Sequence, residues 1–126
     1  MHLLDTNIIV CLLNGEPTVL DALSRLGNVA IPTTVLGELY FGAMRSSLPE
    51  KNVARLEELA GHTPVISCDA ETAREYGRIK SQLLGIGRPI PENDIWIAAL
   101  ALQHNATLVT RDGHFANVSN LKHESI

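Results

Sequence analysis

The stretch that decides the fold is residues 2–13, HLLDTNIIVCLL. A short, mostly apolar run over residues 2–5 ends in Asp5-Thr6-Asn7, and a second apolar run over residues 8–13 follows at once. Asp5, Thr6 or Asn7 can each cap the start of a helix, because their side-chain oxygens accept hydrogen bonds from free backbone N–H groups. The pattern therefore predicts a strand, a tight turn and a helix.

The same alternation continues along the chain. Further strands are predicted over residues 29–31, 64–68, 107–110 and 121–124. Further helices are predicted to begin at Pro17, after a cap at Thr33 or Thr34, at Pro49, after Asp69, and at Glu92 or Asn93. Short apolar strands that alternate with helices predict an α/β fold, with a mostly parallel central sheet covered by helices on both faces. In such sheets, ligands bind at the carboxyl ends of the strands.

Two of these helices carry informative patterns. The helix after Asp69 is expected to bury a stripe of residues spaced three and four apart, namely Ala70, Ala73, Tyr76, Ile79 and Leu83. The helix that runs to His104 is apolar on nearly every side, which is typical of a buried central helix.

Composition narrows the class of protein. With 126 residues, 45% of them apolar and 19% charged, the chain has the size and hydrophobicity of one globular domain, over residues 1–126. A net charge of −4 and 4% aromatic residues argue against a basic nucleic-acid coat or a base-stacking platform. Two cysteines cannot form a disulfide framework, and no secretory leader or membrane-length apolar run is recognisable. We therefore expect a cytoplasmic protein without a membrane partner.

Four acidic residues stand where burial is expected: at the end of a strand, inside an apolar helix, at the start of the buried helix, and just after a strand. They are Asp5, Glu38, Asp94 and Asp112. Burying a lone carboxylate costs several kcal/mol unless it is paired or binds a metal. No lysine or arginine lies within one helical turn of Asp94 in the sequence. If the four side chains converge, a divalent cation is the natural compensation, and oxygen ligands favour Mg²⁺ or Mn²⁺.

Each acidic residue also has an ordinary explanation. Asp5 could simply cap a helix, Glu38 could reach solvent, and Asp94 could be a first-turn acid favoured by the helix dipole. Asp112 followed by Gly113 is a good turn pair. A single one of these residues is weak evidence, whereas the set of four is stronger because strand order can bring them to one edge.

Two neighbouring side chains leave alternatives open. The Thr110 hydroxyl could orient Asp5 if their strands are neighbours, or could serve structural hydrogen bonding alone. His114, two residues after Asp112, is the one histidine that could belong to the site, although we expect it to be exposed to solvent. The histidines show no metal-like spacing, so a zinc site is not predicted.

Four motifs together give the chain a recognisable pattern. They are LLDTN at residues 3–7, VLGELYFGA at 35–43, PENDIWIAA at 91–99, and TLVTRD at 107–112 followed by Phe115. In their order and spacing the chain resembles PIN-domain toxins of the VapC and FitB type, the ribonucleases of type II toxin–antitoxin pairs. The resemblance covers essentially the whole sequence.

This resemblance implies a PIN-like three-layer α/β sandwich and a metal-dependent endoribonuclease. Its catalytic residues, which would also hold Mg²⁺ or alternatively Mn²⁺, are Asp5, Glu38, Asp94 and Asp112. Its supporting residues are Thr6, Asn7 and Thr110. Basic residues that could hold the RNA backbone are Arg111, Arg88, Lys80 and Arg45. The implied partners are an RNA substrate, a second copy of the chain, and a cognate antitoxin that carries the DNA binding.

Alternatives from other classes stay open. An acid-tipped α/β phosphatase would need a second aspartate at the position of Asn7, and a phospho-acceptor domain would need a lysine where Arg111 stands. A non-enzymatic alternative is a protein-binding module of an antitoxin–DNA autoregulatory complex, with a nuclease site that the cell does not use.

Overall fold

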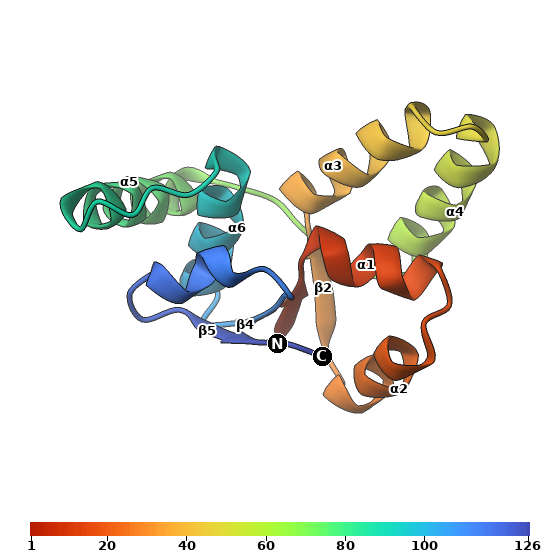
Figure 1. The fold of residues 1–126 in the computed structure, drawn as a ribbon, viewed down its shortest axis with the longest axis horizontal. Coiled ribbons are helices and arrows are strands. Elements are labelled where there is room, and N and C mark those ends of the chain that lie inside the picture. The colour runs from red at the N-terminus through yellow and green to blue at the C-terminus, as the bar shows by residue number, and fades with distance from the viewer.

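The computed structural model describes all 126 residues and contains a wholly parallel five-stranded sheet with helices on both faces (Figure 1). The strands are β1 (His2–Leu4), β2 (Val29–Pro32), β3 (Val65–Ile66), β4 (Thr107–Val109) and β5 (Lys122–Glu124). The helices are α1 (Thr6–Leu13), α2 (Pro17–Leu26), α3 (Thr33–Met44), α4 (Pro49–His62), α5 (Ala70–Gly85), α6 (Glu92–Gln103) and the short 3₁₀ helix η1 (Gly113–Asn117). The predicted α/β sandwich with a parallel sheet is confirmed.

The strand order, β3-β2-β1-β4-β5, creates a reversal in the middle of the sheet. The chain moves outward from β1 to β2 and β3, and then returns across β1 to form β4. Because parallel crossovers are right-handed, α1–α4 cover one face and α5–α6 the other. Figure 1 shows α5 and α6 on the opposite side of the strands from α1 and α2. The switch point lies between β1 and β4, where α/β proteins of this type bind ligands.

The first turn follows the prediction, with Asp5 as the cap of α1. Asp5 has extended backbone angles (φ −77°, ψ 163°), and its carboxylate accepts a hydrogen bond from the Thr6 backbone N–H. Thr6 and Asn7 lie inside the helix, so their side chains are free to make other contacts.

The predicted cap of α3 is wrong. Pro32 occupies the cap position, and no side chain bonds the free N–H groups there. The Thr33 hydroxyl donates instead to the Ile66 carbonyl of β3, at 2.9 Å. The Thr33 hydroxyl therefore bonds a distant strand and does not cap its own helix.

The predicted stripe of α5 is partly wrong. Ile79 and Leu83 are buried as expected, but Ala70 and Ala73 are exposed and Thr72 is fully buried. Thr72 is drawn inward because its hydroxyl accepts from the Asp69 backbone N–H in a capping box and also bonds Gln103 of α6. A polar residue thus occupies the first position of the buried stripe.

The buried central helix is α6, as predicted. Every residue from Ile97 to Ala101 has an exposed fraction of 0%, and these residues belong to one continuous hydrophobic core. The predicted strand over residues 64–68 is shorter than expected, because only Val65 and Ile66 pair with β2 at the edge of the sheet. None of the helices has the length and hydrophobicity that crossing a membrane requires.

Candidate active site

Asp5 is held at the carboxyl end of β1, at the switch point of the sheet. Only 4% of the residue is exposed, and three donors bond its carboxylate. Oδ1 accepts from the Thr6 backbone N–H at 2.8 Å. Oδ2 accepts from the Thr110 hydroxyl at 2.7 Å and from the Asn7 side-chain amide at 3.2 Å. Hydrogen bonds from several donors fix the orientation of a buried carboxylate.

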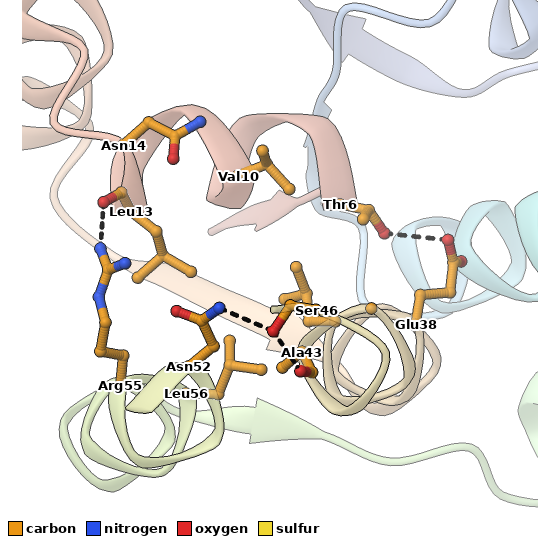
Figure 2. A pocket seen from close by; sticks show the side chains of 12 residues that line it. Thr6, Val10, Leu13, Asn14, Glu38, Ala43, Ser46, Asn52, Arg55 and Leu56 are labelled. Carbon is orange, nitrogen blue, oxygen red and sulfur yellow. Dashed lines mark hydrogen bonds between the residues drawn. The ribbon is translucent and has the colours of Figure 1, made fainter. Parts of the chain in front are cut away.

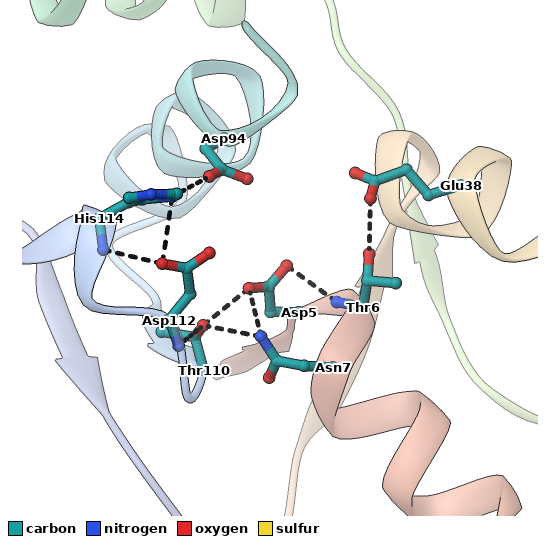
Figure 3. Close-up of polar contacts among 8 residues, drawn as sticks. All are labelled: Asp5, Thr6, Asn7, Glu38, Asp94, Thr110, Asp112 and His114. Atoms are coloured by element: carbon teal, nitrogen blue, oxygen red, sulfur yellow. Dashed lines mark hydrogen bonds and ion pairs between the residues drawn. The ribbon is translucent and has the colours of Figure 1, made fainter. Parts of the chain in front are cut away.

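Thr110 and Asn7 connect this carboxylate to the end of β4. Thr110 is 3% exposed, and its hydroxyl oxygen accepts from the Asp112 backbone N–H at 3.0 Å while its hydrogen goes to Asp5. The Asn7 amide oxygen accepts from the Arg111 backbone N–H at 3.1 Å, which directs the amide nitrogen toward Asp5. Figure 3 shows these side chains joining the red helix α1 to the blue end of β4.

Glu38 reaches the same space from α3. Its neighbours Val35 and Leu39 are buried, which turns the half-buried Glu38 side chain toward α1. The Thr6 hydroxyl donates to Glu38 Oε2 at 3.2 Å. Burial raises the pKa of Glu38, and the charges of Asp5 and Asp94 raise that pKa further, while the hydrogen bond from Thr6 opposes them.

Asp94 and Asp112 approach from the other side of the switch point. Asp94 is the third residue of α6, and its side chain is 15% exposed. Burial raises the pKa of Asp94, the charges of Asp5 and Asp112 add to this effect, and His114 opposes it. Asp112 caps η1 by accepting a hydrogen bond from the His114 backbone N–H at 2.9 Å.

The structure thus brings all four predicted acidic side chains to one place, and Figure 3 shows their carboxyl groups facing a common space. They come from four separate elements: the end of β1, α3, the start of α6 and the start of η1. No lysine or arginine forms an ion pair with any of them, and His114 is their one basic partner. Uncompensated carboxylates at this density suit a divalent cation, and their oxygens are the ligand type that Mg²⁺ and Mn²⁺ accept.

Two residues that the sequence did not place in the site also contact these acids. His114 Nδ1 lies 3.2 Å from Asp94 Oδ2 and 3.1 Å from Asp112 Oδ1. The Asn93 side chain lowers the pKa of the Glu38 carboxyl and so opposes the effect of burial. The sequence contains one clue to both residues, which is their closeness to predicted acids: Asn93 directly precedes Asp94, and His114 follows Asp112 by two positions.

The four basic residues predicted to contact RNA differ in whether their side chains already have partners within the protein. Arg111 is bonded to Glu16 at 2.7 Å and to the Ile126 carbonyl at 2.8 Å. Lys80 pairs with Glu92 at 2.5 Å. Arg45 lies over the Phe41 ring, 5.8 Å from its centroid, and the exposed Arg88 side chain has no protein partner.

A groove leads away from the acidic cluster between α1, α3 and α4. Its volume is about 360 Å³, and Figure 2 shows Thr6 and Glu38 at one end and Arg55 at the other. Apolar side chains line its middle, among them Val10, Leu39 and Leu56. The Arg55 guanidinium donates to the Leu13 carbonyl and so connects α4 to the end of α1. The groove is a surface suited to an extended or helical partner segment.

The parallel sheet and the site at its switch point are of the kind found in PIN-domain proteins. The sequence matches the PIN domain family over residues 2–121, and the chain therefore belongs to this family.

The relatives of the chain narrow the class further. It is 34% identical to ribonuclease VapC2 of Haemophilus influenzae over 115 residues, which is 88% of this chain and 86% of the relative. It is 32% identical to the tRNA(fMet)-specific endonuclease VapC of Shigella flexneri, over 97% of this chain and 95% of the relative. The chain also superimposes with a TM-score of 0.93 on the crystal structure of VapBC2 from Rickettsia felis, which is bound to a DNA fragment from the VapBC2 promoter. The sequence identity is 32%, and the match covers 99% of this chain and 98% of the other. The chain is thus a homologue of the VapC ribonucleases.

Proposed function

We propose that the chain is a divalent-metal-dependent endoribonuclease and the toxin of a type II toxin–antitoxin pair, acting in the cytoplasm. The observation that carries the proposal is the convergence of Asp5, Glu38, Asp94 and Asp112 with no lysine or arginine to neutralise them. The homology to VapC ribonucleases supplies the reaction class, which is hydrolysis of phosphodiester bonds in RNA.

The donor set fits a hard divalent cation, Mg²⁺ or alternatively Mn²⁺. Asp5, Asp94 and Asp112 would hold it, and Glu38 would join either directly or through water. When bound, the cation supplies a Lewis acid that polarises the phosphodiester and lowers the pKa of a nearby water molecule. The raised pKa values of Glu38 and Asp94 support this assignment, because burial and the neighbouring negative charges both disfavour the charged carboxylates, and a bound cation would stabilise them.

The other residues of the site would keep these carboxylates in position. Thr110 and Asn7 fix the orientation of Asp5, and Thr6 holds Glu38, so the donors are arranged before a substrate arrives. The N-termini of α1 and α6 both lie at the cluster. Their partial positive charge favours an anionic phosphate in a site that would otherwise repel it.

Cleavage of RNA by the purified, partner-free chain tests this proposal. Mixed small RNAs that include initiator tRNA are incubated with Mg²⁺, Mn²⁺ or EDTA, beside Asp94→Asn. Asp21→Asn is the matched control, because Asp21 is exposed on α2 and pairs only with Arg25. We expect metal-dependent cleavage by the wild type and by Asp21→Asn, and none by Asp94→Asn.

Two results would contradict the proposal, and each has its own meaning. Cleavage that survives in Asp94→Asn means that the assigned site is wrong or that a contaminant cuts the RNA. A folded, metal-saturated wild type that cuts no RNA in this set contradicts the nuclease and favours the protein-binding module.

We also propose that a cognate antitoxin covers the groove between α1, α3 and α4 and supplies the DNA binding, and that the chain forms a homodimer. The apolar lining of the groove and its continuity with Glu38 support an occupant that would also block the acidic cluster.

Two exposed apolar residues provide a test variant and its control. Val10 is 43% exposed and lines the groove, whereas Leu20 is 46% exposed on α2 outside it. Val10→Glu is expected to abolish co-purification with the antitoxin, and Leu20→Glu to leave it intact. Equal binding by both variants would place the antitoxin elsewhere.

A further inference from the structure

We propose that His114 supplies a nitrogen ligand to the cation of the acidic cluster, beside Asp94 and Asp112, and that this ligand makes the site prefer Mn²⁺ to Mg²⁺. The inference rests on the proposed metal-dependent function. It departs from the all-oxygen ligand set that the sequence predicts.

The geometry brings three donors of two kinds together. His114 Nδ1 is 3.2 Å from Asp94 Oδ2 and 3.1 Å from Asp112 Oδ1. One donor atom from each of the three residues lies within 4.8 Å of the other two. Figure 3 shows dashed lines from one end of the imidazole ring to both carboxyl groups. At this spacing, small movements of the side chains would allow one ion to bind all three donors.

The backbone that carries the ring is held beside Asp112. The His114 backbone N–H donates to Asp112 Oδ1 at 2.9 Å, so both residues share the first turn of η1. The next residue, Phe115, has an exposed fraction of 0% and anchors that turn in the core. An exposed histidine on a mobile loop would lose more conformational entropy on binding a metal than this one.

The chemistry of imidazole makes the ligand selective. Nδ1 is the ring nitrogen that faces the two carboxyl groups, and it is the atom that would bind the ion. The side chain is about half exposed, and the neutral ring can therefore carry its proton on Nε2 toward water while the Nδ1 lone pair binds the ion. Imidazole nitrogen is accepted by Mn²⁺ and other transition ions, whereas Mg²⁺ prefers oxygen.

The competing explanation is that His114 only bridges the two carboxylates and is displaced when an ion arrives. Electron spin echo modulation of Mn²⁺ bound to the full chain separates the two, because it detects nitrogen coordinated to the ion. We expect a nitrogen signal in the wild type that is lost in His114→Asn. The control is His104→Asn, since His104 is exposed at the end of α6 and contacts no acidic residue.

Binding constants give a second readout. Calorimetric titration with Mn²⁺ and with Mg²⁺ is expected to show that the ratio of the two affinities falls about tenfold in His114→Asn. The ratio should be unchanged in His104→Asn. Mn²⁺ binding without a nitrogen signal, or an unchanged ratio, overturns the role of His114 and leaves the proposed nuclease intact. Failure of the wild type to bind either ion overturns both proposals.

Discussion

The Thr110 hydroxyl donates a 2.7 Å hydrogen bond to Asp5 Oδ2 across 105 positions of sequence. The sheet produces this contact, because β1 and β4 are parallel neighbours in which Leu4 pairs with Val109. The residues that follow this pair, Asp5 and Thr110, therefore meet at the carboxyl edge. The register of two strands thus sets the position of the most buried acid in the site.

Replacing Thr110 by valine tests how much this contact contributes. Thr110→Val keeps the shape of the side chain, but it removes the donor to Asp5 and the acceptor of the Asp112 N–H. Leaving buried polar groups without partners costs about 1–3 kcal/mol, and urea unfolding should show a loss of that size. Thr110→Ser, which keeps the hydroxyl, should recover most of it. Equal stability of the valine and serine variants would contradict the importance of the hydroxyl.

The raised pKa of Asp94 predicts a pH-dependent stability in the metal-free chain. A carboxyl whose pKa is raised by folding holds its proton more tightly in the folded state. Stability therefore falls as the pH rises from about 4, the unfolded value, through the raised pKa. Asp94→Asn lacks this loss. In EDTA we expect its melting temperature to exceed that of the wild type by about 2–5 °C at pH 7 and to match it near pH 4.

Glu92 is a control of opposite sign at the start of the same helix. Its bonds to Lys80 and Tyr76 lower its pKa, so this carboxylate stabilises the folded chain above its unfolded pKa and the effect is lost as the pH falls. Glu92→Gln should therefore melt below the wild type at pH 7. If Asp94→Asn also melted lower at pH 7, the buried negative charge of Asp94 would not be a source of instability.

The fully buried Phe115 is expected to support both the fold and the site. Phe115→Ala should cost about 3–5 kcal/mol in urea unfolding, because it leaves a cavity beneath η1. Mn²⁺ affinity should fall as well, measured where the variant is still folded, since η1 carries Asp112 and His114. Phe115→Leu, which fills most of the space, should retain most of the stability and the affinity. Unchanged affinity in a destabilised Phe115→Ala would show that the core does not position these residues.

The basic residues are expected to contribute unequally to RNA binding. Arg88 has no protein partner, whereas Arg111 is occupied by Glu16 and the Ile126 carbonyl. In an inactive Asp94→Asn background, Arg88→Gln should reduce the slope of log affinity against log salt by about 0.7, the value for one phosphate contact on a single strand. Arg111→Gln should leave the slope unchanged. Fluorescence anisotropy at several salt concentrations measures both, and a larger effect at Arg111 would reverse the assignment.

The sequence predicted the parts of the structure that depend on local pattern. The apolar run before Asp5, a helix cap among Asp5, Thr6 and Asn7, and the buried helix α6 all follow from spacing and residue type. It also marked the four acidic residues, because each interrupts or ends a segment that is otherwise apolar. Their convergence then followed from the order of the strands.

The errors arose where a side chain finds its partner in a distant element. Thr33 bonds the carbonyl of Ile66, and Thr72 bonds Gln103, so neither residue behaves as its own helix would suggest. His114 is exposed, as expected, but the sequence did not show that its ring also contacts Asp94 on α6. Sequence spacing cannot reveal such contacts, because they depend on how the sheet brings separate segments together.

The strand order has a consequence for the nascent chain. The first strand to be synthesised, β1, lies in the middle of the sheet, and one of its two neighbours, β4, is among the last segments to be made. While translation is under way, Asp5 therefore lacks the Thr110 hydroxyl, and the cluster lacks Asp112. On the proposed function, a ribosome can make most of this ribonuclease before any finished active site exists beside its own RNA.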